Sequence, residues 1–472
     1  MLSLNVLSTD ETEALHQATL RILAETGLTL THPQARELLF AAGASAQGSR
    51  VLLPPELVEA ALATCVRQVR LRGRGGTVKV LGDGGLHWHN LGGAPDVYDH
   101  RSGKRRRATL QDVRDSTRLL DALEGATTIT PFFTPIDVPG ALMSLAMYRH
   151  ALPYTTKPLQ GPGVQNGAEV GFALRMAEVV GPPAEVLSLS VSPVSPLNFS
   201  DEAVGAILAI ARAGVPFGPL PCPTAGTTAP FTIAGAVAQQ NAEVLGCIVL
   251  AQLTRPGLPI TYCGRLAMME PRTGVSVWGG VELGLASAVT VQIGHRYGLP
   301  VNVYGLSTNA HILDIQNGYE RALNAAIPAL AGADELSGIG EMEAGVMGSY
   351  AQMVCDSEIA ASVRRLRAGV GVDSASLAVE VIASVMNSGH NFLAHKHTRQ
   401  ALRSGEVLLT RYAERRPWEP WERAGRESMA ERAQADAERL LAEHQVPPLD
   451  PAQEHALDEI MTAAEKALVQ NK

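Results

Sequence analysis

Residues 187–226 read LSLSVSPVSPLNFSDEAVGAILAIARAGVPFGPLPCPTAG, and this stretch decides the fold class. It contains two short apolar runs, Leu187–Val191 and Phe217–Pro221, separated by a segment with helical periodicity. Apolar runs that alternate with helices indicate βα units around a parallel sheet, because parallel strands need a long crossover connection. Each run ends in small residues, at Ser192–Pro196 and Pro221–Gly226, as in the loops that bind ligands at one face of such a sheet.

The same alternation continues on both sides and supplies eight candidate strands. They are Thr128–Phe133, Leu159–Gly161, Leu187–Val191, Phe217–Pro221, Ile260–Cys263, Val301–Tyr304, Glu335–Ile339 and Gln352–Cys355. Eight parallel strands are typical of a closed barrel rather than an open sheet. The sequence therefore predicts an α/β protein with a TIM (β/α)8 barrel over residues 126–370.

Two further segments flank the predicted barrel. Residues 1–125 are expected to form an N-terminal cap, in which Ser8 and Glu11 have capping-box spacing and Thr77–Tyr98 has the β-branched, glycine-rich pattern of a hairpin. Residues 371–472 are charge-rich and helical. We expect this C-terminal extension to pack on the barrel or on a neighbouring subunit of a homo-oligomer.

The composition argues against several classes of protein. The chain has 39 Lys+Arg against 47 Asp+Glu, and its net charge of −8 disfavours binding to nucleic acid. The short basic run Lys104–Arg107 is interpreted as a solvated loop, with docking of an acidic partner as the alternative. Five scattered cysteines without CxxC spacing indicate a reducing compartment. Without a signal-peptide pattern or a membrane-length apolar run, we expect a cytoplasmic protein that does not associate with membranes.

The most distinctive run is PLPCPTAGTTAPFT at residues 219–232. Thr224, Gly226 and Thr227 would present hydroxyls and backbone N–H groups between a strand and a helix, which suits polar groups of a ligand. A tight structural turn is the alternative. Nucleotide-binding GxGxxG and GxxxxGK[ST] motifs and the GxSxG elbow of serine hydrolases do not occur in these contexts.

Five segments resemble the trimethylamine methyltransferase family in the same order. They read GGAPDVYD at 92–99, PTAGTTAPFTIAGAVAQQNAE at 223–243, RTGVSVWGGVELGLASAVTVQIGHRYGLP at 272–300, DIQNGYERALNAAIPALAGA at 314–333 and GHNFLAHKHT at 389–398. The resemblance implies a barrel whose C-terminal mouth binds a methylamine. It also implies that a partner protein supplies a corrinoid (cobalamin) cofactor, whose Co(I) takes a methyl group in an S_N2 reaction.

Some members of this family carry pyrrolysine, by resemblance near Ser307–Asp314, where this chain reads STNAHILD. Loss of a methyl group from a neutral tertiary amine would expel an amide-like anion, whereas a quaternary ammonium expels a neutral amine. The ordinary residues in this loop therefore favour a quaternary substrate, such as glycine betaine, carnitine or a proline betaine, over trimethylamine. We expect the protein to position and desolvate the reactants, without a catalytic acid or base.

A permanent cation is best held by aromatic faces and by a carboxylate. The aromatic residues at predicted strand ends or in the family motifs are Trp88, Tyr98, Phe132, Phe133, Tyr304 and Tyr350. Each of them can instead belong to the core, and Phe132 and Phe133 should point to opposite sides of a regular strand. The acidic candidates are Asp96 and Glu341, followed by Glu343, with structural salt bridges as the alternative.

The remaining site predictions concern the rest of the substrate and the cofactor. A substrate carboxylate is expected to contact Gln160, Asn309, His311 or Arg272. The loops that face the corrinoid are expected to contain Gly161, Thr224, Gly226, Thr227 and Ser307.

Two alternative functions stay open at this point. His390, His395 and His397, or His87 and His89, have spacings that can chelate zinc, which would make the protein a zinc-dependent barrel methyltransferase or hydrolase. No suitably spaced cysteine or carboxylate completes either set, so no tightly bound metal is expected. The second alternative is a non-catalytic protein that binds a betaine or a corrinoid.

Overall fold

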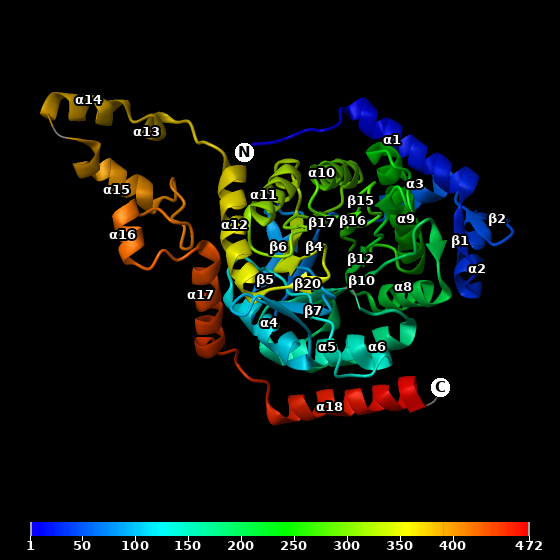
Figure 1. The fold of residues 1–472 in the computed structure, drawn as a ribbon. Helices are drawn as coiled ribbons and strands as arrows, with labels where there is room; N and C mark the ends of the chain where they lie inside the picture. The colour runs from blue at the N-terminus through cyan, green and yellow to red at the C-terminus, as the bar shows by residue number, and fades with distance from the viewer. Residues whose placement is uncertain (1, 162, 390, 471–472) are drawn as a thin grey trace.

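Strands surrounded by helices form the centre of the molecule (Figure 1), and their parallel pairings run round a ring. The computed structural model describes residues 2–161, 163–389 and 391–470. The ring contains β6 (His87–Asn90), residues 127–130, β9 (Leu159–Gly161), β10 (Leu187–Val191), β12 (Phe217–Pro219), β14 (Tyr262–Gly264), β17 (Val301–Tyr304) and β18 (Glu335–Ile339).

Neighbouring members of the ring are joined in chain order. Parallel ladders join β9 to β10, β10 to β12, β14 to β17, and β17 to β18. Single parallel bridges join His89 to Thr128, Ile129 to Leu159, and Phe217 to Ile260. The parallel pairing of β18 with β6 closes the circle. The predicted TIM barrel is therefore confirmed.

Two of the predicted elements were wrong. Gln352–Cys355 was predicted as a strand but lies in helix α12 (Tyr350–Ala368), where every residue from Ala351 to Asp356 is buried. A short apolar run looks the same in a buried strand and in a buried helix, so periodicity could not separate them. The predicted hairpin over Thr77–Tyr98 instead supplies three strands with different partners, including β6, the first strand of the ring.

The other strands of the predicted hairpin lie outside the ring. β5 (Val78–Leu81) pairs with β4 (Val69–Arg72), and β7 (Asp96–Asp99) pairs with β8 (Lys104–Arg107) and β20 (Met347–Gly348). The barrel thus takes its first strand from the segment that was assigned to the cap.

A helix follows each strand of the ring and covers the barrel from outside, as a (β/α)8 topology requires. In chain order these helices are α4 (Leu110–Ala122), α5 (Met143–Ala151), α6 (Gly167–Val180), α8 (Asp201–Ala213), α9 (Ile233–Thr254), α10 (Val281–Arg296), α11 (Ile315–Leu330) and α12. The short helices η2 (Gly140–Leu142), η3 (Leu152–Tyr154) and α7 (Pro183–Val186) lie between them.

Helix α9 is the most deeply buried of these helices. Within the described residues it is the one helix long and apolar enough to cross a membrane, but 83% of its apolar window is buried in the protein. The N-terminal helices α1 (Thr9–Arg21), α2 (Pro33–Ala41) and α3 (Pro55–Ala63) pack on it (Figure 1). Its apolar composition is therefore that of a core helix.

The N-terminal segment confirms the predicted capping box, since Ser8 accepts from the Glu11 backbone and Glu11 accepts from the Ser8 backbone. After α1 the chain forms a π-helical turn, η1 (Ile22–Thr26), and ends it at Gly27. The strands β1 (Leu28–Leu30), β2 (Ser45–Gln47) and β3 (Arg50–Leu52) then form a sheet with β11 (Asn198–Phe199).

Short strands lie beyond the carboxyl ends of the barrel strands. The loops after β12 and β14 form a small sheet of β13 (Thr224–Ala225), β15 (Ala267–Met269) and β16 (Ser276–Val277). β19 (Glu341–Met342) and β20 follow β18 and join β7 and β8. These two sheets belong to the C-terminal mouth, where TIM barrels place their active sites.

The C-terminal segment has two parts (Figure 1). α13 (Ser374–Leu377), α14 (Val379–Ser388), η4 (Phe392–Ala394), α15 (Lys396–Arg403) and α16 (Trp418–Arg423) stand away from the barrel as an arm. α17 (Met429–Glu443) returns to pack on α12 and α4, and α18 (Pro451–Glu465), continued by η5 (Lys466–Gln470), packs on α6 and α5.

Candidate active site

The interior of the barrel is polar and charged. Lys79 of β5 forms an ion pair with Glu335, the first residue of β18, and donates a hydrogen bond of 2.5 Å to Thr128. Both charged side chains are almost fully buried. Burial by itself would raise the pKa of Glu335, but the neighbouring Lys79 outweighs this effect and lowers the pKa to about 2. The Glu335 carboxylate is therefore ionised inside the barrel, whereas burial lowers the pKa of Lys79 and Glu335 opposes this effect.

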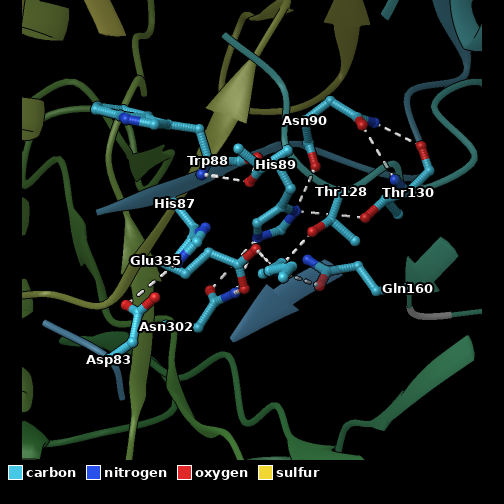
Figure 2. Close-up of polar contacts among 12 residues, drawn as sticks. Asp83, His87, Trp88, His89, Asn90, Thr128, Thr130, Gln160, Asn302 and Glu335 are labelled. Carbon is cyan, nitrogen blue, oxygen red and sulfur yellow. Dashed lines mark hydrogen bonds and ion pairs between the residues drawn. The ribbon is translucent and has the colours of Figure 1, made fainter. Parts of the chain in front are cut away.

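Asn302 connects this ion pair to the upper part of the barrel. Its Nδ2 donates to Glu335 Oε2 at 2.6 Å and to His89 Nε2 at 3.0 Å (Figure 2). Its Oδ1 accepts a hydrogen bond from Arg265. A carboxylate only accepts hydrogen bonds and a guanidinium only donates them. The amide group of Asn302 can therefore satisfy both neighbours in only one orientation, with Nδ2 toward Glu335 and Oδ1 toward Arg265.

His89 completes this polar layer. Its Nδ1 lies 2.7 Å from the backbone oxygen of Asn90, and burial lowers its pKa to about 4. The ring is therefore neutral near pH 7, with its proton on Nδ1 and with Nε2 free to accept from Asn302.

Arg265 marks the boundary between the barrel interior and the mouth. Its side chain lines both a small interior cavity and a larger cavity of about 620 Å³ at the mouth. The residue is only 5% exposed, and its guanidinium carbon lies 5.0 Å from the centre of the Tyr304 ring. It forms no ion pair with any residue that the structure describes. A buried cation without a carboxylate partner is a strong indication of a site for an anionic group.

The mouth cavity is built from the loops that follow β12, β14, β17 and β18. The Trp278 ring forms part of its wall and lies against Tyr304, with ring centres 4.6 Å apart and planes tilted by 40°. Arg265 and Trp278 thus lie against the same tyrosine ring. The cavity joins an aromatic face to a buried cation.

Asn309 holds the segment that carries Trp278. Its Oδ1 accepts from the backbone N–H groups of Trp278 at 2.7 Å and Gly279 at 2.8 Å, and its Nδ2 donates to the Ser276 oxygen at 3.1 Å. A Cβ atom at Gly279 would lie 2.1 Å from the Glu320 carboxylate and would displace this side chain, whose Oε2 accepts a hydrogen bond from the Asn309 backbone at 2.9 Å. The loop is therefore fixed before any ligand binds.

The rim of the cavity carries paired charges. Glu343 contacts Arg105 at 3.0 Å and His311 at 3.3 Å. Its backbone has φ +50°, a left-handed conformation that is rare outside glycine and that often occurs at functional sites. The basic run that was interpreted as a loop is strand β8, and its Arg105 and Arg107 both pair with Asp96, at 3.3 and 3.1 Å.

A larger cavity of about 960 Å³ lies elsewhere at the mouth, around the N-terminal ends of α6 and α8. Its lining includes the carboxylates Glu169 and Glu202, but the described residues around it supply neither an aromatic ring nor a basic side chain. We therefore take the cavity that contains Trp278 and Arg265 as the candidate active site.

Some of the predicted site residues come together at this cavity. Thr224, Asn309, His311 and Glu343 line it, and Tyr304 lies behind Trp278 and Arg265. Gly226 and Thr227 are exposed on the neighbouring loop after β12. Of the residues predicted to face the corrinoid, Gly161 and Ser307 are buried.

Other predicted residues lie apart from it. A buried or half-buried aromatic cluster contains Phe132, Phe133 and Tyr350. The ring centres of Phe132 and Phe133 lie 4.6 Å apart, so the two rings share one side of the chain, which is possible because this segment is not a regular strand. The Tyr350 hydroxyl donates to Asp112 at 2.9 Å. Tyr98 stacks edge-on with His100.

Three more candidates lie below or beside the cavity. Gln160 lines the interior cavity near Lys79, and Trp88 is fully buried in β6. Arg272 is exposed and pairs with Glu270 at 2.7 Å.

Glu341 is buried behind the cavity. Its Oε1 accepts from the Thr308 backbone at 3.2 Å, while its Oε2 and the nearby Ser307 hydroxyl lack partners of normal hydrogen-bond geometry among the described residues. Burial raises its pKa to about 8. Near pH 7 the carboxyl is therefore mostly neutral and offers little negative charge to a bound cation.

The histidine pairs do not form a metal centre in the described part of the chain, where no group of three or more His, Cys, Asp or Glu side chains is arranged to hold an ion. His395 accepts a hydrogen bond from the His397 backbone and lies on the arm, and His390 lies outside the described residues. His87 lies near Asp83, at 3.6 Å.

Among the cavity residues that the sequence analysis did not single out are Arg265, Trp278 and Cys222. Trp278 had a usable signal, since it is one of only 4 tryptophans and lies within a family-like segment. Cys222 lies in the distinctive run at 219–232, but Arg265 had no signal, because its importance comes from what other parts of the chain place beside it.

The fold and the cavity define a TIM-barrel protein with a small-molecule site at the carboxyl mouth of the barrel, the place where such proteins carry out catalysis. The chain belongs to the trimethylamine methyltransferase (MTTB) family, whose sequence model matches residues 1–468. It is thus a member of a family of methyltransferases.

Individual relatives match almost the whole chain. Trimethylamine methyltransferase MttB of Methanosarcina barkeri is 32% identical over 98% of this chain and 96% of its own length. Glycine betaine methyltransferase of Desulfitobacterium hafniense strain Y51 is 29% identical over 95% of this chain and 94% of its own. The solved structure of Methanosarcina barkeri monomethylamine methyltransferase (MtmB) superposes with a TM-score of 0.51 and 14% identity, covering 91% of this chain and 92% of that one, and it supports the fold alone.

Proposed function

We propose that this protein transfers a methyl group from a small quaternary amine, of the glycine betaine type, to the corrinoid of a partner protein. The observation that carries this proposal is the position of Trp278 in the wall of the mouth cavity, with the carboxylate of Glu343 at the rim. An aromatic face attracts a quaternary ammonium through the negative face of its ring, whereas Glu343 is itself paired with Arg105 and His311. The name of one relative, glycine betaine methyltransferase, supports the same substrate class.

The reaction needs little chemistry from the protein. The partner's corrinoid, as Co(I), supplies the nucleophile that accepts the methyl group. The C–N bond breaks and its electron pair stays on nitrogen, so a neutral tertiary amine leaves and no proton donor is needed. The cavity residues have to hold the cation with one methyl group toward the mouth and to exclude water, which is catalysis by positioning.

The mouth also offers a surface for a protein partner. Large apolar side chains are exposed in most of the loops around it: Ile136, Val194, Phe231, Val275, Ile312, Ile315 and Val346. Val275 and Val346 also line the substrate cavity, so the apolar rim is continuous with the site. Exposed apolar residues that surround an active-site mouth are typical of a docking surface. A corrinoid domain docked on this rim would face the substrate directly.

A screen of quaternary amines against reduced corrinoid tests the proposal. The absorbance of Co(I) should change on addition of glycine betaine, carnitine or a proline betaine, and not on addition of trimethylamine. Calorimetry without corrinoid should show binding of the same compounds. Failure of every quaternary amine in both assays would refute the proposal, and tight binding without methyl transfer would favour a binding protein instead.

A further inference from the structure

We propose that Arg265 binds the carboxylate of a zwitterionic substrate and thereby selects betaines over quaternary amines that lack an acid group. This inference rests on the proposed function and names the chemical class that the site accepts. It assigns a specificity-determining role to a residue inside the barrel.

The first argument is the unbalanced charge of Arg265. A guanidinium stays protonated in proteins, and a buried charge is costly unless an opposite charge accompanies it. Arg265 is 5% exposed, yet the groups to which it donates are neutral: the Gly264 oxygen at 3.1 Å, the Asn302 backbone oxygen at 2.9 Å and the Asn302 side chain. The nearby Glu335 is already paired with Lys79. A substrate carboxylate would provide the missing negative charge.

The second argument is that Arg265 is held in place before the substrate binds. Asn302 can accept from Arg265 only while its amide group donates to Glu335 and to His89. The Tyr304 ring packs against the guanidinium from another direction. The polar interior of the barrel, which the methyl transfer itself does not need, therefore serves to fix one cation at the inner end of the substrate cavity. A preorganised guanidinium binds a carboxylate with little loss of entropy.

The third argument is the order of charges along the cavity. Arg265 reaches down to the interior cavity, whereas Glu343 belongs to the rim, where it pairs with Arg105 and His311. Trp278 lies against the same tyrosine ring as Arg265. A betaine with its carboxylate at Arg265 would place its ammonium group at Trp278, with the methyl groups toward the mouth. The demethylated product keeps its carboxylate and can be held in the same way.

Glycine betaine and choline form a matched pair of ligands, since both carry a trimethylammonium group and only the former carries a carboxylate. Calorimetry on the full chain without corrinoid should show that wild type binds glycine betaine more tightly than choline. Arg265→Gln should weaken glycine betaine binding by roughly 10- to 100-fold, as expected for loss of a charge-assisted hydrogen-bonded pair. The affinity for choline should change by less than about twofold, because choline has no carboxylate that could pair with Arg265.

Arg272→Gln is the control, because Arg272 is a basic residue of the same region that is exposed and paired with Glu270. It should leave the affinity for both ligands unchanged. Arg265→Lys keeps the charge without the planar fork and should retain part of the preference for glycine betaine. If Arg265→Gln does not fold, the role of Arg265 is tested by the Arg265→Lys variant and by the affinities of wild type for glycine betaine and choline.

The outcomes separate this inference from the proposed function. The role of Arg265 would be overturned if wild type bound glycine betaine and choline equally, or if Arg265→Gln bound glycine betaine as tightly as wild type. Methyl transfer from either compound would still support the proposed function. If no quaternary amine binds or reacts, both fail together. A loss of glycine betaine binding in Arg272→Gln alone would move the carboxylate contact to the surface.

Discussion

The amide oxygen of Asn309 accepts a hydrogen bond from the backbone N–H of Trp278 at 2.7 Å and so fixes the wall of the mouth cavity. Asn309 was expected to contact a substrate carboxylate, but its side chain is occupied with residues 276–279. Its effect on the substrate is therefore indirect, through the position of the tryptophan ring.

Replacement of Asn309 tests this positioning role. Asn309→Ala leaves two backbone N–H groups without their acceptor and should cost about 1–3 kcal/mol of stability. It should also weaken substrate binding, because Trp278 loses its support. Asn309→Asp keeps the accepting oxygen but loses the donation to the Ser276 oxygen, so it should lie between the Ala variant and wild type in both respects. Thermal unfolding and calorimetry measure the two effects, and an Asp variant as impaired as the Ala variant would contradict the argument.

Substitution of Trp278 tests the cation site itself. A cation–π contact contributes about 0.5–2 kcal/mol, so Trp278→Leu should raise the dissociation constant for a quaternary amine by roughly 2- to 30-fold. Trp278→Phe keeps a smaller ring and should lie between Leu and wild type. Trp278 is half-buried and does not belong to the buried core cluster, so both variants should fold. Equal affinity of the Leu variant and wild type would remove Trp278 from the site.

Breaking the ion pair of Lys79 and Glu335 should destabilise the barrel strongly. Lys79→Met leaves a buried carboxylate without its cation, and Glu335→Gln leaves a buried ammonium, each at a cost of about 3–5 kcal/mol. The double variant leaves no unpaired charge, so it should be less destabilised than the sum of the single variants. Denaturant unfolding of the four proteins measures the coupling, and additive effects would show that the pair contributes no specific interaction.

Glu341 should make stability depend on pH. Burial raises its pKa from 4.5 to about 8, so between these pH values the folded protein keeps a proton that the unfolded chain has released. The free energy of unfolding must therefore fall as pH rises through this window, by up to a few kcal/mol. Glu341→Gln cannot ionise and should lose this part of the slope, becoming more stable than wild type at the upper end. If the free energy of unfolding depended on pH in the same way in both proteins across this window, Glu341 would have to be ionised in the folded state.

The apolar rim should matter only when the corrinoid is bound to a protein. Ile315 is 88% exposed at the first turn of α11, where a carboxylate is favourable for the helix, so Ile315→Glu should fold normally. It should slow methyl transfer to a partner-bound corrinoid and leave transfer to free cobalamin unchanged. Leu393→Glu, at an exposed apolar position on the arm, is the control. If Ile315→Glu slowed methyl transfer to the partner-bound corrinoid and to free cobalamin equally, the substitution would be acting on the substrate site and not on partner docking.

The sequence alone was sufficient for the fold class and for most of the barrel strands. β10 and β17 lie at the predicted positions Leu187–Val191 and Val301–Tyr304. Hydrophobic periodicity is a local property, and burial on both faces makes a parallel strand apolar along its whole length. The same reasoning found the loops of the mouth, because loops after strands carry small residues.

What the tertiary structure decided was which distant groups meet. Only strand pairing shows that His87–Asn90 closes the ring and that Gln352–Cys355 does not. Likewise, the sequence made Asp96 look available to a cation, but two arginines from β8 neutralise it. The sequence also gave no sign that Arg265 would lack an ionic partner among the residues that the structure describes. Charge pairing acts through space between residues far apart in the chain, so the site's electrostatics are fixed only once the barrel has closed.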